Sequence, residues 1–552
     1  MITLIYIVLG MVLFPVIAAG FAGWGTLLGK ICRINFTEGY DREEKILTGI
    51  FLLYLLAGIW NFFLPAGRLF AVLFFIPGLC LTLFFRKEIK WDKGDFLHLV
   101  LLFVFSFFAL GAIKVHDTYL YYLDTIRWIN EYAVVPGLAN VHSRLGFNQF
   151  YFYFPALLEA VLPGTGLNFA NPFLGFIAAA IFIDSRRVPA DRYLAALLLG
   201  CIAAYSLRGE LSSASPDTAV TFLMLIMFFL FARQLREKSG GRFTFFLFFA
   251  VTGVLTKLSF AVAAAGIVFI VFLQEKEKIK VLFRSLPFTA VLCGVWMLRS
   301  IYLTGYLVYP VHFLAFDVPW KLSLETVRNE QLSIIGWARK SGPDCMNAAK
   351  NGISYWIKGY ILEKGHIFLT YFRVFVTTAA LWIYFSEKNR KNYIRILQLY
   401  FPIAAGLIFW WCTAPDPRFA YPLLFFSVLY PAAAAFERFS CTRSAFWTIV
   451  LTVFLIFLPP AAAPKFLYQL ISKGKTPRLE RVCEVKFTDH GVPLCVTPDI
   501  PLSDRMKQDP EKATGKVSLP STPYYNADLK FLGKGIKDGF VIRKKNTVST
   551  HH

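Results

Sequence analysis

The chain has 552 residues, 57% of them hydrophobic and 17% charged, and a formal net charge of +22. Soluble globular chains carry about 25% charged residues, so a soluble protein of this composition could not bury its apolar side chains. The apolar residues form blocks of about 16–24, the length of helix that crosses roughly 30 Å of hydrocarbon. We therefore predict an all-α polytopic membrane protein, whose positive charge belongs to loops on one side of the bilayer and not to nucleic-acid binding.

We expect a bundle of about 13–14 transmembrane helices with large external loops. Their predicted ranges are 2–28, 46–64, 69–85, 96–114, 168–184, 193–207, 217–233, 243–257, 259–273, 281–303, 367–385, 396–413, 421–436 and 446–463. The short apolar stretch 150–162 is typical of a re-entrant or interfacial helix, and alternatively it extends the following span.

The same ranges divide the chain into three parts. The predicted parts are N-terminal transmembrane helices at 1–95, a membrane core at 96–464 with external loops 114–167 and 305–366, and an external C-terminal tail or small domain at 465–552. The core contains most of the polar residues that are candidates for function.

Lysine and arginine gather in alternate loops, at residues 86–93, 186–192, 233–242, 276–284, 388–395 and 438–443. Cytoplasmic loops carry such an excess of basic residues. Both termini, the two large loops and the tail are therefore expected on the external side, which is the periplasmic side if the protein lies in a bacterial inner membrane. In that oxidising compartment Cys483 and Cys495 can form a disulfide, with two free thiols as the alternative.

The loop at residues 116–148 is dense in polar groups that a membrane interior would reject. Its first half contains no proline and has aromatic residues every three or four positions, so we predict a helix over residues 117–133. Helical spacing places Asp117 and Asp124 on one face of it. A carboxylate can accept a proton from a sugar hydroxyl or bind a divalent metal such as Mg²⁺ or Mn²⁺. Asp117 and Asp124 are therefore the catalytic candidates.

Tyr121 and Trp128 share the same predicted face and are substrate-binding candidates, because aromatic faces stack on sugar rings. The carboxylates also have a structural interpretation. Asp117 can cap the helix, and Asp124 can pair with Arg127 at i+3. Glu131, at i+4 from Arg127, would compete for the same guanidinium.

The second half of the loop, residues 135–146, is turn-forming and polar. A loop of this kind can fold over a substrate, and it can equally be a plain connector. On the first interpretation His142 and Arg144, together with His116 at the start of the loop, are further substrate-binding candidates.

Three ionisable residues near the ends of later helices are also substrate-binding candidates. Asp217 follows Ser215 and Pro216, a helix-start signal that explains the carboxylate without any substrate. Lys257 and Arg299 lie next to or inside apolar runs, where each side chain either extends to the membrane surface or meets a phosphate.

Arg418 lies in the first turn of a late predicted helix, just after Asp416. The helix dipole does not stabilise a cation at that end. A planar guanidinium at the external mouth of the bundle is suited to a lipid phosphate or pyrophosphate. We therefore predict that Arg418 binds the phosphate of a lipid substrate.

These motifs resemble those of the GT-C-fold membrane glycosyltransferases, which include dolichyl-phosphate-mannose-dependent mannosyltransferases and bacterial aminoarabinose transferases. The matching sequences, within residues 97–440, are His116-Asp117 followed by Asp124, then Ser215-Pro216-Asp217, and finally Arg418-Phe419-Ala420-Tyr421-Pro422. The resemblance implies a GT-C-like bundle that transfers a sugar, with inversion, from a polyprenyl-phosphate donor to a lipid, glycan or protein acceptor of the cell envelope. It also implies that the first-loop carboxylate activates the acceptor and that basic residues hold the phosphate.

Other functions are compatible with this sequence. Lipid-linked-glycan transporters or flippases commonly have repeated halves and charges near mid-membrane, whereas no internal repeat is evident here and the polar clusters lie at the outer ends of spans. An O-antigen polymerase or ligase also uses large external loops and arginines. A non-catalytic partner in envelope glycan synthesis is a further alternative.

Overall fold

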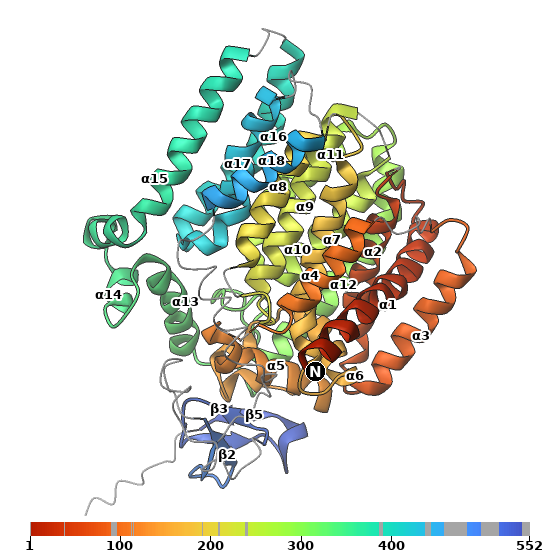
Figure 1. Ribbon diagram of the computed structural model, residues 1–552. Coiled ribbons are helices and arrows are strands. Elements are labelled where there is room, and N and C mark those ends of the chain that lie inside the picture. Colours follow the sequence, from red (N-terminus) through yellow and green to blue (C-terminus); the bar gives the residue numbers. More distant parts are fainter. Residues whose placement is uncertain are drawn as a thin grey trace, which may run out of the picture.

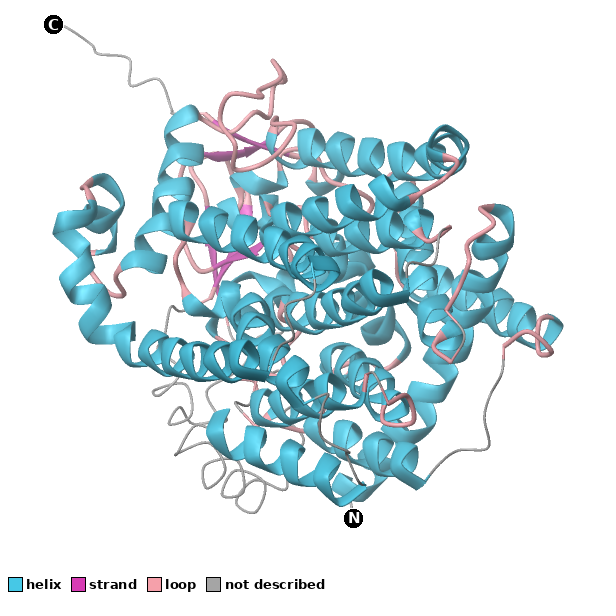
Figure 2. Ribbon diagram, turned by 90° about the horizontal axis from the view of Figure 1, so that it is seen from above, coloured by secondary structure: helices cyan, strands magenta, loops and turns pink. Residues whose placement is uncertain are grey.

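The computed structural model describes residues 2–37, 39–89, 96–111, 113, 115–189, 191–207, 210–237, 241–385, 390–436, 443–457, 483–497 and 518–543. Helices make up most of the molecule, with a small group of strands at one end (Figure 1). The strands occupy one small region of the molecule (Figure 2). We call the end of the bundle that carries the strands and α5 (Leu123–Glu131) the loop end.

The N-terminal part of the bundle is built around its first helix. Its helices are α1 (Ile2–Ile31), α2 (Asp41–Trp60), α3 (Arg68–Phe84) and α4 (Phe96–Phe108). Helix α1 packs along the other three. A side-chain carbon at Gly25 would collide with the backbone of Lys45, and one at Gly49 would collide with the backbone of Phe21. Glycine therefore allows α1 and α2 to approach more closely than larger residues would.

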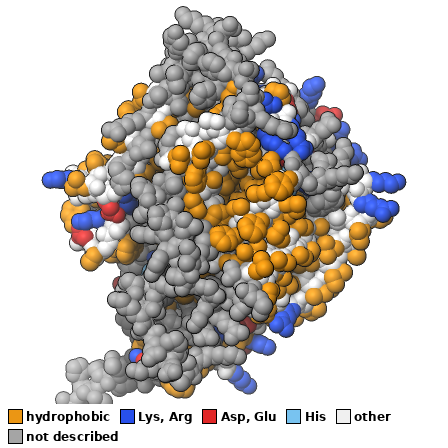
Figure 3. All heavy atoms as spheres, viewed as in Figure 1, with side chains coloured by type: hydrophobic (Ala, Val, Ile, Leu, Met, Phe, Trp, Pro, Cys, Tyr) orange, Lys and Arg blue, Asp and Glu red, His pale blue; other side chains and the backbone are white. Residues whose placement is uncertain are grey.

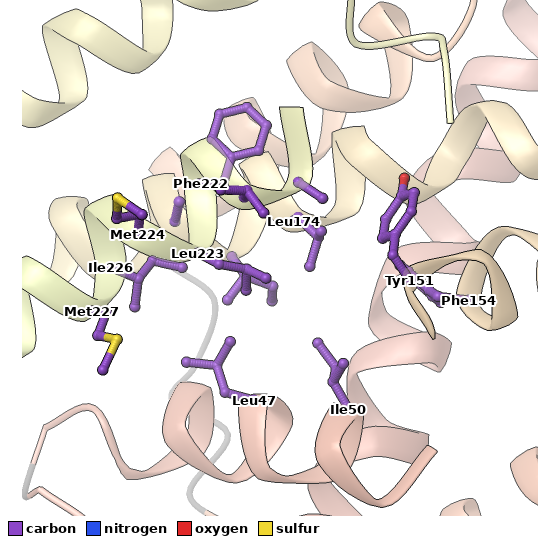
Figure 4. Close-up of a cluster of buried hydrophobic side chains, with 14 of the residues drawn as sticks. Leu47, Ile50, Tyr151, Phe154, Leu174, Phe222, Leu223, Met224, Ile226 and Met227 are labelled. Carbon is purple, nitrogen blue, oxygen red and sulfur yellow. The ribbon is translucent and has the colours of Figure 1, made fainter. Parts of the chain in front are cut away.

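Six further helices are apolar along most of their length. They are α7 (Ala170–Ser185), α8 (Arg192–Ser206), α9 (Pro216–Glu237), α10 (Phe243–Thr256), α11 (Ala261–Gln274) and α12 (Lys278–Thr304). The apolar windows of α7 and α9 are completely buried. Leu47 from α2, Leu174 from α7 and Leu223 from α9 meet in the core between them (Figure 4). A helix enclosed by others needs no polar face.

Five helical segments of the described chain are long and apolar enough to cross a membrane. They are Leu4–Ile31, Gly166–Ser185, Pro216–Glu237, Lys278–Thr304 and Ile394–Thr413, and six shorter apolar helices accompany them. Large apolar side chains are exposed along α1, α3 and α12, and Figure 3 shows a broad hydrophobic patch with Lys and Arg around it. Such a surface is suited to contact with lipid. The described chain is thus mostly helical, and its five candidate spans are compatible with the predicted all-α membrane protein.

The first loop is not the single regular helix predicted over residues 117–133. A π-helical turn, Thr118–Tyr122, precedes α5, which ends at Glu131. The i→i+5 bonds of a π turn widen it relative to an α turn, so the regular helical spacing does not apply through this segment. The stretch predicted at 150–162 is a separate short helix, α6 (Tyr153–Val161), that packs on α3 and α5.

The second large loop contains two short helices and the first turns of a third. The helices of this half are α13 (Leu324–Arg339), α14 (Cys345–Lys350), α15 (Ile353–Phe385), α16 (Arg390–Thr413), α17 (Pro417–Phe436) and α18 (Arg443–Phe457). Helix α15 begins at Ile353, within the range predicted as the external loop 305–366. Helix α4 ends at Phe108, before the end of the span predicted at 96–114. The last residues of the span predicted at 446–463 lie outside the described residues.

Residues 483–497 and 518–543 form a small β structure, which we call the C-terminal module. Strand β1 (Glu484–Phe487) pairs antiparallel with β2 (Pro493–Val496), and β2 pairs parallel with β3 (Ser521–Thr522). Strand β4 (Leu529–Phe531) pairs antiparallel with β5 (Phe540–Ile542).

A disulfide joins Cys483 to Cys495, with their Cα atoms 5.4 Å apart. Of the two alternatives left open for Cys483 and Cys495, the structure has the disulfide, and this part of the tail has a defined fold. The remainder of the predicted tail lies outside the described residues.

Candidate functional site

Arg144 connects the two limbs of the first loop. Its Nη1 donates to Asp117 Oδ1 at 3.0 Å, and its Nε lies 3.3 Å from Glu330 Oε1 on α13. Ser143 Oγ donates to the other oxygen of Glu330 at 2.6 Å. The loop is therefore folded back, and Arg144 is held between two carboxylates.

Burial and neighbouring charges shift the pKa values of groups around this ion pair. Burial alone would lower the pKa of Arg144, but Asp117 and Glu330 outweigh it and the pKa is raised. The guanidinium carbon lies 5.9 Å from the ring centre of Tyr121. Burial, followed by the charge of Asp117, raises the pKa of Tyr121, so its phenol stays neutral. The side chains of Asp117 and Arg144 remain 24% and 21% exposed, which leaves the pair accessible to a substrate.

A second polar group lies where α9, α10 and α17 approach one another. Asp217, in the first turn of α9, forms an ion pair with Lys257, which directly follows α10. The ammonium group of Lys257 also lies 4.0 Å from the ring centre of Phe419. The break between α10 and α11 thus presents a lysine at the end of a helix that is otherwise apolar.

Asp416 and Arg418 form the start of α17. The backbone N–H of Arg418 donates to Asp416 Oδ1 at 3.0 Å, and the guanidinium Nε lies 3.6 Å from the same oxygen. Lys364 of α15 is 3.5 Å from the other carboxylate oxygen, and it also donates to the carbonyl of Ala338 on α13 at 3.0 Å. Asp416 therefore caps the N-terminus of α17, while the Arg418 side chain is still 47% exposed.

Asp117 lies within electrostatic reach of both Lys257 and Arg418. Tyr122 is likewise within electrostatic reach of Asp117 and Arg418. We call Asp117, Arg144, Asp217, Lys257 and Arg418 the polar site. It combines the partly exposed carboxylate of Asp117 with three cations, of which Lys257 and Arg418 come from the bundle, so it can handle a proton and an anion together.

Asp124 and Trp128 lie against the C-terminal module. Asp124 is 1% exposed, and its Oδ1 accepts a hydrogen bond from Ser521 Oγ at 2.7 Å. The rings of Trp128 and Phe540 are 6.2 Å apart and nearly perpendicular. The C-terminal module therefore covers this part of the helix face that was predicted to bind substrate. This placement favours a structural role for Asp124 and Trp128.

Arg127 and Glu131 form the i+4 ion pair that was considered as an alternative, with 3.2 Å between Nε and Oε1. Asp124 therefore does not need Arg127 as its partner. This pair is partly exposed, so it contributes about 0.5 kcal/mol or less to the free energy of unfolding.

The remaining residues predicted to bind substrate are His116, His142 and Arg299. His116 is exposed at the start of the loop. His142 is buried, with its ring 5.6 Å from that of Tyr524 in the C-terminal module. Arg299 donates to Asn148 Oδ1 at 2.7 Å and lies over the ring of Tyr153. These contacts anchor the end of the first loop to α12.

Glu330 was missed by reasoning from the sequence. It lies in the second large loop, on a helix that the hydrophobic pattern does not mark, and its partner Arg144 belongs to the first loop. The sequence provided one indication of this contact, because both loops were predicted on the external side of the membrane. Among the described residues, no group of three or more His, Cys, Asp and Glu side chains could hold a metal ion.

The fold and the polar site together define the class of this protein, a mostly helical protein with five helices that could span a membrane and an ionisable site at one end of its bundle. The chain belongs to the family described as "Domain of unknown function (DUF8201)", whose model matches residues 4–425. No curated protein and no solved structure matches it. The match includes all five residues of the polar site and stops before the C-terminal module.

Proposed function

We propose that the protein is a membrane glycosyltransferase that moves a sugar from a polyprenyl-phosphate donor to a lipid, glycan or protein acceptor of the cell envelope. The observation that carries the proposal is the convergence of Asp117 with Lys257 and Arg418 at the loop end. Glycosyl transfer requires a base for the acceptor hydroxyl and positive charge for the departing phosphate. The resemblance of the surrounding motifs to GT-C-fold glycosyltransferases supports the same activity.

In this proposal Asp117 takes the proton of an acceptor hydroxyl while the hydroxyl oxygen attacks the anomeric carbon of the donor sugar. The bond from that carbon to the phosphate oxygen breaks, and its electron pair leaves with the phosphate. Lys257 and Arg418 stabilise the charge on the released polyprenyl phosphate. Arg144 orients Asp117. Attack from the side opposite the leaving group inverts the anomeric configuration.

The positive charges of Lys257 and Arg418 bear on whether the proposed reaction needs a metal cofactor. Mg²⁺ or Mn²⁺ at the phosphate would supply positive charge, and Lys257 and Arg418 can supply it from the chain itself. The proposed reaction therefore does not require a metal, although a divalent metal remains a candidate cofactor.

The alternative of a lipid-linked-glycan transporter is less well supported. A conduit needs polar groups along its path, whereas the centre of the bundle around Leu174 and Leu223 is filled by apolar side chains (Figure 4). The polar site lies at one end of the bundle. This arrangement supports an enzyme at the membrane surface.

Purified protein in proteoliposomes, supplied with a polyprenyl-phosphate carrying a radiolabelled hexose and with an envelope extract as acceptor, tests the proposal. We expect the label to appear in the acceptor fraction while free polyprenyl phosphate is released. Movement of intact labelled donor between leaflets without release of polyprenyl phosphate would contradict a transferase and indicate a transporter. Liposomes without protein are the control.

We also propose that the loop end faces outward, because the basic loops gather at the opposite ends of the helices. A cysteine at Asp317, which is fully exposed at this end, should react with a membrane-impermeant maleimide added to intact cells. A cysteine at Lys280, at the start of α12, should react only after the membrane is opened. The reverse pattern would invert the proposed orientation.

A further inference from the structure

The chain forms a short hairpin directly after α12. The backbone N–H of Leu307 donates to the carbonyl of Leu314 at 2.8 Å, and that of Phe316 donates to the carbonyl of Gly305 at 2.8 Å. A further antiparallel bridge joins the two arms. These bonds hold Phe316 next to Gly305, the residue that follows the last turn of α12. We call residues 305–316 the hairpin.

One side of the hairpin is buried, and this burial fixes its conformation. Tyr306 and Tyr309 belong to a small buried cluster with Leu322 and Val327. The hydroxyl of Tyr306 donates to the carbonyl of Leu322 at 3.1 Å, and the ring of Tyr309 lies 5.8 Å from that of Phe147 in the first loop. The side of the hairpin that faces the protein is therefore already occupied by its two tyrosines.

The other side of the hairpin is apolar and exposed. Phe313, Leu314 and Phe316 are 73%, 37% and 44% exposed. The next residue, Asp317, is fully exposed and lies 3.5 Å from Lys321, so the apolar tip ends at a charged pair. Large apolar side chains that are grouped on a well-ordered hairpin are unfavourable in water, and such a group marks a surface of contact.

The length of α12 places the hairpin at the surface of the bilayer. From Arg284 to the end of the helix at Thr304, α12 extends about 30 Å at 1.5 Å per residue, which is the thickness of the hydrocarbon layer. Arg299 is the one charged residue between them in the sequence, and it is buried. Val291 and Leu298 are exposed and apolar, as contact with lipid requires. The hydrocarbon crossed by α12 therefore ends near Thr304, just before the hairpin.

Aromatic residues at the end of α12 indicate the same depth. The ring of Tyr302 lies 5.5 Å from that of Phe62, which follows α2, and 5.9 Å from that of Trp320. Trp320 Nε1 donates to the carbonyl of Ile301 at 3.0 Å. Tyrosine and tryptophan are enriched at the interface between membrane and water. Phe63, beside Phe62, is exposed, so a second helix also presents an apolar side chain at this level.

We propose that the hairpin is a membrane anchor, whose tip at Phe313 and Phe316 inserts between the lipid headgroups of the bilayer at the loop end. The partner is the lipid surface itself, because the tip directly continues the lipid-facing side of α12. The inference rests on α12 crossing the bilayer and not on the transfer of a sugar. It assigns a contact to the exposed apolar residues of the second large loop, which the proposed reaction does not use.

The anchor determines the level of the polar site relative to the membrane. Phe147, which contacts Tyr309 of the hairpin, also lies 5.7 Å from the ring of Tyr121. Arg144 lies over that ring, 5.9 Å from its centre. A row of packed rings thus joins the hairpin to Arg144, so a tip fixed among the headgroups holds the polar site near lipid phosphates. This consequence for a lipid-linked donor rests on the proposed function.

Photocrosslinking from the tip tests the anchor. The aromatic photocrosslinker p-benzoylphenylalanine replaces Phe313 in the full-length protein, which is reconstituted into proteoliposomes that contain a phospholipid with tritiated acyl chains. Illuminated benzophenone reacts with C–H bonds of the molecule that it contacts. We expect tritium to become attached to the protein as strongly as from the same substitution at Phe283, which is also 73% exposed and lies on α12.

The matched control is the same substitution at Phe487, which is 66% exposed in the C-terminal module, at the outer edge of the loop end (Figure 1). It should attach no more tritium than a sample kept in the dark. Each variant must elute from detergent size-exclusion chromatography like the wild type.

The results distinguish the anchor from the span on which it rests. Tritium from Phe283 but not from Phe313 would overturn the anchor and leave α12 as a span. Tritium from neither position would overturn both. A crosslinked dimer formed through Phe313 in place of a lipid adduct would show that a second copy covers the tip, and equal labelling from Phe487 would show that the reaction does not report membrane contact; either result would overturn the inference.

Discussion

Replacing Asp117 with Asn should lower the rate of sugar transfer by about 100- to 10,000-fold, the usual contribution of a general base. The amide is nearly the same size as the carboxylate and can still accept the hydrogen bond that Arg144 donates to Oδ1. It cannot take a proton from the acceptor hydroxyl. The measurement is the initial rate of label transfer in proteoliposomes, at equal amounts of protein with matching elution profiles in detergent.

The matched control is Asp124→Asn, in the same loop. Its amide oxygen can accept the hydrogen bond from Ser521, so the attachment of the module should survive and the rate should stay within a few-fold of wild type. Full activity in Asp117→Asn would remove the central claim. A large loss in Asp124→Asn with an intact fold would return Asp124 to the catalytic role predicted from the sequence.

Replacing Arg418 with Gln should raise the donor KM by about 10- to 100-fold, because a hydrogen bond to a charged group contributes about 1.5–3 kcal/mol. The Arg418 side chain is half-exposed and its ion pair with Asp416 is long, at 3.6 Å, so it is available to a phosphate. Arg418→Lys should be intermediate, since it keeps the charge but loses the planar fork. Donor and acceptor KM values are measured separately.

Arg127→Gln serves as the control for this charge change. Arg127 is also partly exposed and paired with a carboxylate, Glu131, but it lies outside the polar site. Its loss should leave both KM values near those of wild type. Equal increases in donor and acceptor KM on changing Arg418 would argue against a phosphate-binding role.

The sequence left open whether Cys483 and Cys495 pair and predicted several polar side chains at one end of the bundle, but it did not predict the helical geometry of the first loop. Helical spacing assumed a regular turn at Thr118–Tyr122, where the chain instead forms a π-helical turn. It also treated Asp124 as open to substrate. Ser521, 397 residues further along the chain, covers it, and no local pattern could show this.

Arg299 and Glu330 show that residues from distant segments decide what a charged side chain contacts. Arg299 is an ionisable residue near the end of an apolar helix, which suggested either a phosphate ligand or a side chain that extends to the membrane surface; in the structure it donates to Asn148 and lies over the ring of Tyr153. Glu330 gave no signal, yet it holds Arg144. The function of a charged side chain depends on its partner, and both partners here come from a different loop or helix.

Sequence by itself determined the class of this protein, because the length and apolarity of a helix are local properties and the membrane sets the required length. It also identified Asp117, Lys257 and Arg418 as unusual ionisable residues near helix ends. Only the tertiary structure decided which of these residues lie close together. The ion pairs join segments that are distant in the chain, and so do the contacts that hold the C-terminal module against the first loop. Packing of the helices brings Asp117 close to the two cations, and the same packing places Asp124 under the module.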